Sequence, residues 1–222
     1  MMPVSDGRMG WFALMGAEQL RNGTVQPVRL AGVPLAVWRT GDGRASVWLD
    51  RCPHRGMRLS FGEVQDDVLL CPYHGWSFGA DAQCRAIPAH PDKKPPRTAR
   101  AAAMQVVETD GLIWGGAPQT AGFDAPALPE GAAGFTLLRS IVVTGALGQV
   151  ASDLVAGPLL PDSPLRASGG AVLADDHAVL MLPVDVDRTL LHVLTAPDMN
   201  PVRKDALATA VKRLRFALHA AA

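Results

Sequence analysis

The sequence predicts a mostly β N-terminal domain followed by a small α+β C-terminal domain. Short apolar stretches up to residue 116 are separated by turns containing Gly and Pro, a pattern typical of antiparallel strands. Residues 117–134 are rich in Ala, Pro and Gly and lack periodicity, which indicates a connection. Beyond it, three strand-like segments precede one helical pattern. We therefore predict a first domain at residues 1–118, a linker at 119–134 and a second domain at 135–222.

The elements of the first domain follow from local patterns. Residues 17–23 (AEQLRNG) are expected to form a helical turn that ends at Gly23. Apolar alternation on both sides of residues 41–43 (GDG) predicts a hairpin, because Asp-Gly is a favoured turn sequence. Residues 68–84 and 104–116 show two further hairpin-like patterns. Residues 88–100 (PAHPDKKPPRTAR) are predicted to form an exposed loop, and a docking surface for an acidic redox partner is the alternative interpretation.

The second domain is predicted from three strand-like segments and a helix. Residues 135–145 (FTLLRSIVVTG) indicate one strand, and residues 178–186 and 188–196 indicate a pair. In residues 201–222, apolar side chains recur near helical spacing, and Pro201 suits the first turn of a helix.

Composition excludes several classes of function. The chain has 222 residues with a formal net charge of zero, so no charge excess favours nucleic acid or an anionic membrane. Aromatic residues make up 5%, which argues against a stacking platform for bases or sugars. No apolar window is long enough to span a membrane, and Asp6 interrupts the N-terminal stretch that a signal peptide would need. We expect a soluble cytoplasmic protein.

Cysteine usage indicates metal binding rather than disulfides. There are three cysteines, an odd number in a chain that we expect to be cytosolic. Cys84 has no neighbouring histidine partner and is predicted to be a buried, small apolar residue. The other two lie in short loops of similar form, CPHRG at residues 52–56 and CPYHG at residues 71–75.

These two loops predict a two-iron cluster. Each loop supplies one Cys and one His, and sixteen residues separate His54 from Cys71. Structural zinc is the alternative, but it usually takes its ligands from C-x2-C or H-x3-H patterns. A [2Fe–2S] cluster can instead take two Cys on one iron and two His on the other. The glycine after each His lets backbone amides approach the bridging sulfides.

The pattern C-x-H-x16-C-x2-H resembles the Rieske [2Fe–2S] site, and its surroundings resemble the Rieske non-heme iron oxygenases of the ring-hydroxylating and O-demethylase type. The resemblance extends from about residue 10 to 116 and includes GWFALMGAEQL, DRCPHRGMRLSFGEV and LLCPYHGWSFGADAQCRAIP. It implies stacked antiparallel sheets, with Cys52 and Cys71 ligating one iron and His54 and His74 ligating the other. It also implies a second domain of the helix-grip type.

The flanking residues differ from those of the respiratory-chain Rieske proteins. Those proteins carry an additional disulfide-forming Cys in each loop, where this chain has Met57 and Tyr73. They also place a Ser where this chain has Trp76. Because a hydroxyl donor stabilises the reduced cluster, its loss predicts a potential at the low end of the Rieske range, on the order of −150 mV. Arg55 and Trp76 are interpreted as packing and shielding residues, with a direct redox role as the alternative.

The second domain departs from the resemblance at its metal site. Family members hold a mononuclear Fe(II) with two His and one carboxylate, usually as Asp-x2-His-x4-His with a second carboxylate far downstream. Asp153 fits the first position, but Ala156 and Pro161 occupy the His positions. We therefore expect no mononuclear iron here. A relocated site would have to use His177 or His192 with nearby carboxylates, which are Asp175, Asp176, Asp185 and Asp187.

The resemblance also implies how such a chain would work. Family members form head-to-tail rings in which the cluster of one subunit feeds the iron of its neighbour across an acidic bridge. Asp153 lies at the position of that bridging acid, with a solvated or capping role as the alternative. We expect an oxidoreductase component that receives electrons from a reductase or ferredoxin and passes them to an iron-bearing oxygenase subunit in a homo- or hetero-oligomer. A free-standing ferredoxin-like carrier and a compact complete mono- or dioxygenase remain the alternatives.

Overall fold

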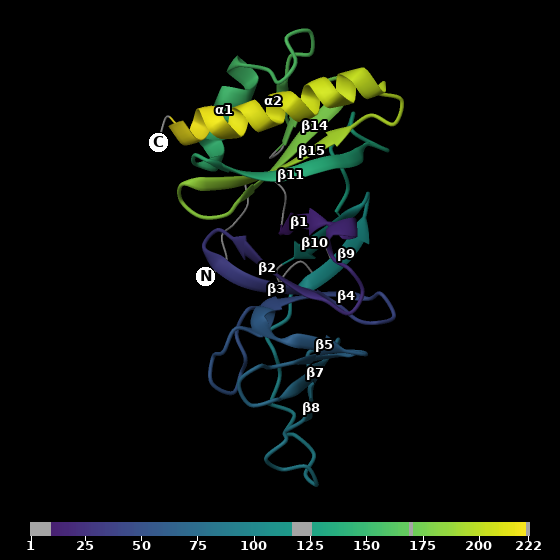
Figure 1. Ribbon diagram of the computed structural model, residues 1–222, viewed down its shortest axis with the longest axis vertical. Coiled ribbons are helices and arrows are strands. Elements are labelled where there is room, and N and C mark those ends of the chain that lie inside the picture. Colours follow the sequence, from purple (N-terminus) through teal and green to yellow (C-terminus); the bar gives the residue numbers. More distant parts are fainter. Residues whose placement is uncertain (1–9, 117–125, 169–170, 221–222) are drawn as a thin grey trace.

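The computed structural model describes residues 10–116, 126–168 and 171–220. The molecule is elongated, with the N-terminal sheets at one end and the C-terminal sheet with its two helices at the other (Figure 1). Antiparallel pairing throughout and an α+β second domain confirm the predicted fold class. The predicted linker lies partly outside the described residues, so the domain bounds stay a prediction.

Three antiparallel sheets build the N-terminal domain. Their orders are β1-β10-β9, β2-β3-β4 and β5-β6-β7-β8. The predicted hairpins around residues 41–43 and 110–111 are confirmed. The predicted helical turn is the short 3₁₀ helix η1, which ends at Gln19 rather than at Gly23. The elements are β1 (Trp11–Gly16), η1 (Ala17–Gln19), β2 (Val25–Leu30), β3 (Val33–Arg39), β4 (Ala45–Leu49), η2 (Leu59–Phe61), β5 (Glu63–Gln65), β6 (Val68–Leu70), β7 (Ser77–Gly79), β8 (Cys84–Ala86), β9 (Gln105–Thr109) and β10 (Leu112–Gly116).

One five-stranded antiparallel sheet builds the C-terminal domain, in the order β11-β15-β14-β13-β12, with both helices packed on one face. Helix α1 and the short strand pair β12–β13 were not predicted from the sequence. A ten-residue helix with only Val150 and Leu154 buried shows little hydrophobic periodicity, and strands of three residues are too short to show any. The elements are β11 (Thr136–Thr144), α1 (Leu147–Ala156), β12 (Arg166–Ser168), β13 (Ala171–Leu173), β14 (His177–Pro183), β15 (Arg188–Thr195) and α2 (Pro201–Ala220).

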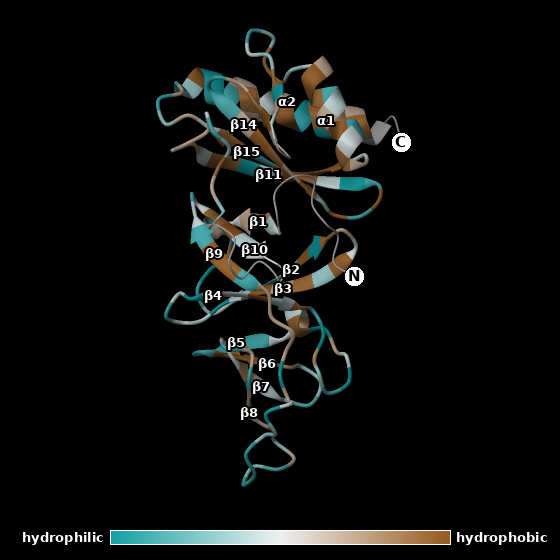
Figure 2. Cartoon of the chain, turned by 180° about the vertical axis from the view of Figure 1, so that it is seen from behind, coloured by the Kyte–Doolittle hydropathy of each residue, from teal (hydrophilic) through white to brown (hydrophobic). Residues whose placement is uncertain are grey.

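The two domains share an apolar core. One cluster joins Ala13 of β1 and Trp114 of β10 to Ala178, Leu180 and Leu194 of the C-terminal sheet. A second cluster fills the space between that sheet and the helices, and much of α1 and of the sheet has the hydrophobic colour in Figure 2. The second domain is therefore packed directly on the first.

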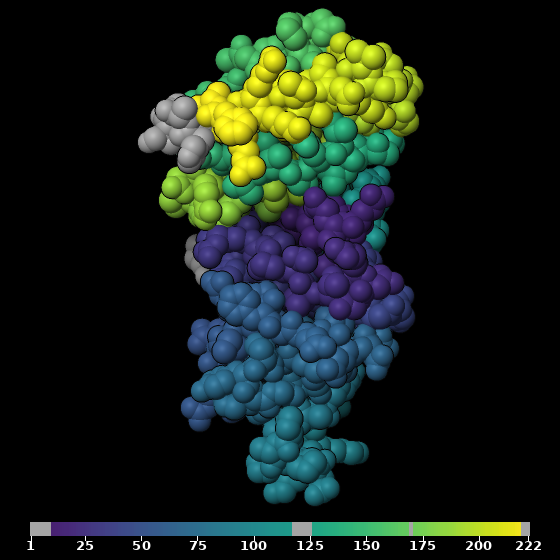
Figure 3. Space-filling model, in the orientation of Figure 1, coloured from purple at the N-terminus to yellow at the C-terminus, as the bar shows by residue number. Residues whose placement is uncertain are grey.

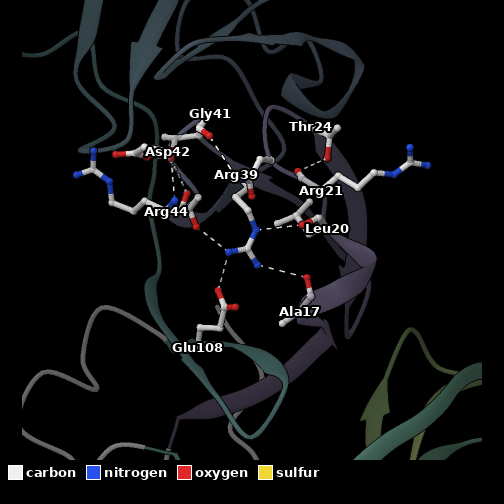
Figure 4. Close-up of polar contacts among 12 residues, drawn as sticks. Ala17, Leu20, Arg21, Thr24, Arg39, Gly41, Asp42, Arg44 and Glu108 are labelled. Carbon is white, nitrogen blue, oxygen red and sulfur yellow. Dashed lines mark hydrogen bonds and ion pairs between the residues drawn. The ribbon is translucent and has the colours of Figure 1, made fainter.

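A buried arginine organises the turns of the N-terminal domain. Arg39 is 7% exposed, and its guanidinium donates to the carbonyls of Leu20 (3.0 Å), Gly43 (2.7 Å) and Ala17 (3.3 Å) (Figure 4). It also pairs with Glu108 at 2.8 Å. A buried charge is tolerated only when its donors are satisfied, and this one ties η1, the β3–β4 hairpin and β9 together.

Candidate iron–sulfur centre

Two loops at the end of the molecule far from α1 and α2 carry the predicted ligands. The first loop follows β4 and contains Cys52 and His54, and the second connects β6 to β7 and contains Cys71 and His74. Asp50 closes the base of the first loop, because its carboxylate accepts hydrogen bonds from the amide (2.7 Å) and hydroxyl (2.6 Å) of Ser60. This contact was not predicted from the sequence, because no motif links Asp50 to Ser60.

The two loops have the same hydrogen-bond pattern. In each, the cysteine amide donates to the carbonyl five residues further on, at 2.7 Å in the first loop and 2.8 Å in the second. The glycine amide four residues after the cysteine donates back to the cysteine carbonyl, at 2.9 and 3.0 Å. Gly56 and Gly75 close these turns with φ angles of +74° and +67°, a region that favours glycine. The repeated motif CP-(x)-HG thus produces two equivalent turns.

The cysteine sulfurs lie inside and next to each other. Cys52 is 2% exposed and Cys71 is 3% exposed, and the two thiols are within hydrogen-bonding contact. Burial, together with the neighbouring Cys71 thiol, raises the pKa of the Cys52 thiol to about 11. The backbone amides of His54 and Arg55 oppose this by donating toward the Cys52 sulfur. The site therefore combines buried sulfur ligands with amides that stabilise negative charge on sulfur.

The imidazoles lie at the surface and are held by aromatic rings. The His54 and His74 rings are 4.7 Å apart between centroids. Trp76, from the second loop, stacks on His54 of the first loop at 4.4 Å with an interplanar angle of 6°. Tyr73 stacks on His74 at 3.8 Å. Desolvation and the nearby His74 and Arg55 lower the pKa of His54, which favours the neutral ring that a metal requires.

This donor set fits a [2Fe–2S] cluster better than a single ion. Two buried sulfurs and two exposed imidazoles form two adjacent pairs, as required by a cluster that is held at one end by cysteines and at the other by histidines. Tetrahedral zinc would need four donors around one point. Within the described parts of the chain, no three His, Cys, Asp or Glu side chains converge on one metal position. The four predicted residues could thus hold a two-iron cluster.

The remaining cysteine is structural. Cys84 is 4% exposed within the apolar cluster beneath the two loops, and its thiol contacts the carbonyl of Ala86 at 3.4 Å. The prediction of a buried, small apolar residue is confirmed. All three cysteines are free.

Asp153 lies on α1, at the other end of the molecule from the two loops (Figure 1). Its carboxylate accepts a hydrogen bond from Gln149 at 2.8 Å, one helical turn earlier. Ala156 ends the same helix and Pro161 follows it. Inside one chain, Asp153 therefore does not meet the predicted cluster ligands.

His177 and His192 cannot share a metal ion, because they lie on opposite faces of the C-terminal sheet. His177 pairs with Thr195, whereas His192 lies three residues before Thr195 on the same strand. His177 Nδ1 contacts Asp176 at 2.7 Å on the helix side. His192 contacts Ser140 at 2.8 Å and the carbonyl of Ala13 at 3.1 Å on the other side. The two histidines therefore cannot form a relocated iron site together.

Asp175, Asp185 and Asp187 do not join either histidine. Asp175 pairs with Arg166 at 3.1 Å, and Asp185 pairs with Arg188. The amide of Gly145 donates to the carbonyl of Asp187 at 2.6 Å. The carboxylates of Asp175 and Asp185 therefore serve ion pairs, and Asp187 contributes its backbone to a turn.

Comparison with known proteins agrees with the geometry of the loops. The sequence pattern of the Rieske [2Fe-2S] domain matches residues 10–107. The oxidoreductase NdmD of Pseudomonas putida is 39% identical over 105 residues, which are 47% of this chain and 18% of that protein. The 3-chlorobenzoate-3,4-dioxygenase oxygenase subunit of Comamonas testosteroni is 36% identical over 107 residues, 47% of this chain and 24% of that protein. The chain thus matches less than a third of these relatives' length.

Solved structures extend the similarity in fold across both domains. Dicamba monooxygenase bound to dicamba superimposes with a TM-score of 0.74 at 18% identity, covering 98% of this chain and 87% of that chain. NdmA of Pseudomonas putida CBB5 gives 0.69 at 19% identity, covering 94% and 80%. Within the described residues, no helix is both long and apolar enough to cross a membrane. Residues 10–107 of this chain are therefore a Rieske [2Fe–2S] domain, and the chain shares the overall fold of the dicamba monooxygenase and NdmA structures.

Proposed function

We propose that this chain is the Rieske [2Fe–2S] electron-transfer component of an oxygenase system, which passes electrons to a mononuclear iron on a partner subunit. The observation that carries the proposal is the contrast between the two domains. The first brings Cys52, His54, Cys71 and His74 together in two matched loops. The second keeps an oxygenase-like fold but has Ala156 and Pro161 where the resemblance expects metal-binding histidines.

In this proposal Cys52 and Cys71 hold one iron, and His54 and His74 hold the other. A Rieske cluster, when bound, supplies reversible one-electron transfer. The buried cysteines exclude water from the inner end of the site, and the backbone amides of the first loop donate toward sulfur. The exposed imidazoles give a partner protein a short approach, and Trp76 holds one of them in place.

The core of the second domain also supports the proposal. A core of buried residues lies between the sheet and the helices of the second domain. Here apolar side chains of α1, α2 and the sheet fill that space, including Val150, Leu154, Val193, Leu207 and Val211, each at most 1% exposed. We infer that the domain serves as an assembly surface.

A free-standing carrier is less well supported. That reading needs only the N-terminal domain, whereas Ala13 and Trp114 are buried against Ala178 and Leu194 of the C-terminal sheet. His192 adds a hydrogen bond from the same sheet to the carbonyl of Ala13. Removing the second domain would expose this shared surface.

Metal content and partner transfer test the proposal together. We expect two irons and two sulfides per chain, and reoxidation of the reduced chain by an iron-loaded oxygenase subunit encoded beside it. Three irons per chain would instead favour a compact complete oxygenase. A monomer that transfers no electrons to any companion oxygenase subunit would contradict the proposal. The His54→Ala chain, which lacks one predicted ligand, serves as the control for electron transfer.

A further inference from the structure

We propose that the buried carboxylate of Asp50 lowers the reduction potential of the iron–sulfur cluster through its negative charge. In this role Asp50 ligates no iron and acts on the cluster from the base of the first loop. The inference rests on the ligand set of the proposed function, but it does not depend on the partner that receives the electrons. It adds a second cause of a low potential, independent of the missing hydroxyl donor.

Asp50 lies where the two arms of the first loop meet. It follows β4 and precedes Cys52 by two residues, and its carboxylate reaches across to Ser60 at the far end of the loop. Its own amide donates to the carbonyl of Pro34 in β3 at 3.0 Å, which fixes the backbone at this point. Leu59, the neighbour of Ser60, belongs to the same buried cluster as Cys52. The carboxylate therefore lies at the buried base of the loop that carries Cys52.

The charge of Asp50 is buried without a cation beside it. The residue is 5% exposed, and both of its carboxylate oxygens accept hydrogen bonds from Ser60, as an ionised carboxylate does. In the part of the chain that the structure describes, Asp50 forms no ion pair. Burying an unpaired charge is costly, and a neutral side-chain carbonyl could accept the same amide hydrogen bond. Closing the loop therefore does not by itself require a charge at this position.

The cations nearest to the first loop lie at the surface. The loop contains Arg51, Arg55 and Arg58, and Arg100 lies beside it; all four are exposed. In Figure 3 the blue part of the chain, which contains residues 50–75, forms the outer surface toward the lower end of the molecule. Water and salt screen charges at such a surface far more than a charge buried at the base of the loop. The field of Asp50 at the cluster is therefore less attenuated than the fields of these arginines.

The sign and the size of the effect follow from electrostatics. Reduction adds one electron to the cluster from an external reductant, with no covalent bond made or broken, and a fixed negative charge nearby opposes it. Cα atoms two residues apart, as in Asp50 and Cys52, are separated by at most about 7 Å. At about 10 Å from the cluster and an effective dielectric constant of about 20, one charge changes the ratio of reduced to oxidised cluster on the order of 10-fold. A 10-fold change corresponds to about 59 mV for one electron.

The test measures the midpoint potential of the full chain with its cluster by spectroelectrochemistry. Asp50→Asn removes the charge and nearly preserves the shape of the side chain. We expect its potential to lie above that of the wild type, so that the ratio of reduced to oxidised cluster at the wild-type midpoint rises on the order of 10-fold. Asp67→Asn makes the same change on an exposed carboxylate of the same domain and serves as the matched control. It should leave that ratio within about 2-fold of the wild type.

Ser60→Ala separates the charge of Asp50 from the shape of the loop. It removes the hydroxyl donor but keeps the carboxylate, so less of the negative charge is compensated and the potential should fall below that of the wild type. If Asp50 only shapes the loop, both variants loosen the same contact and shift the potential in the same direction. An unchanged potential in Asp50→Asn, or an unchanged or raised potential in Ser60→Ala, would overturn the inference; where Asp50→Asn does not fold, the Ser60→Ala result decides. A wild-type chain that lacks two irons and two sulfides would instead refute the proposed function itself.

Discussion

Protonation of His192 should weaken the contact between the two domains. The ring is fully buried in β15, and its Nε2 lies 3.1 Å from the carbonyl of Ala13 in β1. A carbonyl only accepts, so Nε2 carries the hydrogen and Nδ1 accepts from the hydroxyl of Ser140 at 2.8 Å. Burial lowers the pKa of His192 to about 4, despite the hydrogen bond to Ala13. The folded protein therefore favours the neutral ring.

The size and the sign of the effect follow from linkage. An unfolded chain protonates this histidine at about pH 6.5, whereas the folded chain does so only near pH 4. The contribution of neutral His192 to the free energy of unfolding is complete above about pH 6.5 and falls as the pH drops through this window. Below pH 4 the free energy of unfolding is lower by about 3 kcal/mol. Burial raises the pKa of Asp176, but hydrogen bonds from neighbouring side chains outweigh it and hold that pKa at about 2. Protonation of Asp176 therefore lowers stability only below pH 3.8, outside the pH range in which His192 acts.

Urea unfolding of the wild type and His192→Gln measures this effect. Glutamine can donate to the Ala13 carbonyl but does not titrate, and all other groups are common to both proteins. At pH 7 we expect the variant to be less stable by about 1–2 kcal/mol, because the packing and the Ser140 contact change. Between pH 7 and 4 the wild type should lose about 3 kcal/mol more than the variant. A difference that is independent of pH would refute the reasoning.

Three further predictions concern the cluster site. Cys71→Ser should abolish the visible spectrum of the native cluster, because an alkoxide is a poor substitute for a thiolate; a native spectrum would contradict the ligand assignment. The midpoint potential, measured by spectroelectrochemistry, should be on the order of −150 mV, and a value above zero would refute the argument from the missing hydroxyl donor. Trp76→Leu should speed the loss of visible absorbance about 2- to 10-fold, because a ring stack is worth about 0.5–1.5 kcal/mol, whereas Trp76→Phe should retain most of it; equal decay rates would exclude a positioning role.

Hairpins of the first domain were predictable because their signals are local. Gly41-Asp42-Gly43 and Asp110-Gly111 form the turns of β3–β4 and β9–β10, and alternating apolar residues fix which face is buried. The second domain was less predictable. Helix α1 buries only two residues, and β12 and β13 are three residues long, so neither leaves a clear period in the sequence.

By itself, the sequence determined which residues are expected to form the iron–sulfur centre and which kind of metal group they favour. The spacing of Cys and His in two similar loops selects a two-iron cluster, since ligand type and turn geometry are set within a few residues. Only the tertiary structure decided what surrounds them. It brought Trp76 of one loop onto His54 of the other, joined His192 to Ala13, and separated His177 from His192 across the sheet. It also gathered Arg51, Arg55 and Arg100 beside the first cluster loop. These contacts join distant segments, and strand register and packing fix them rather than any local pattern.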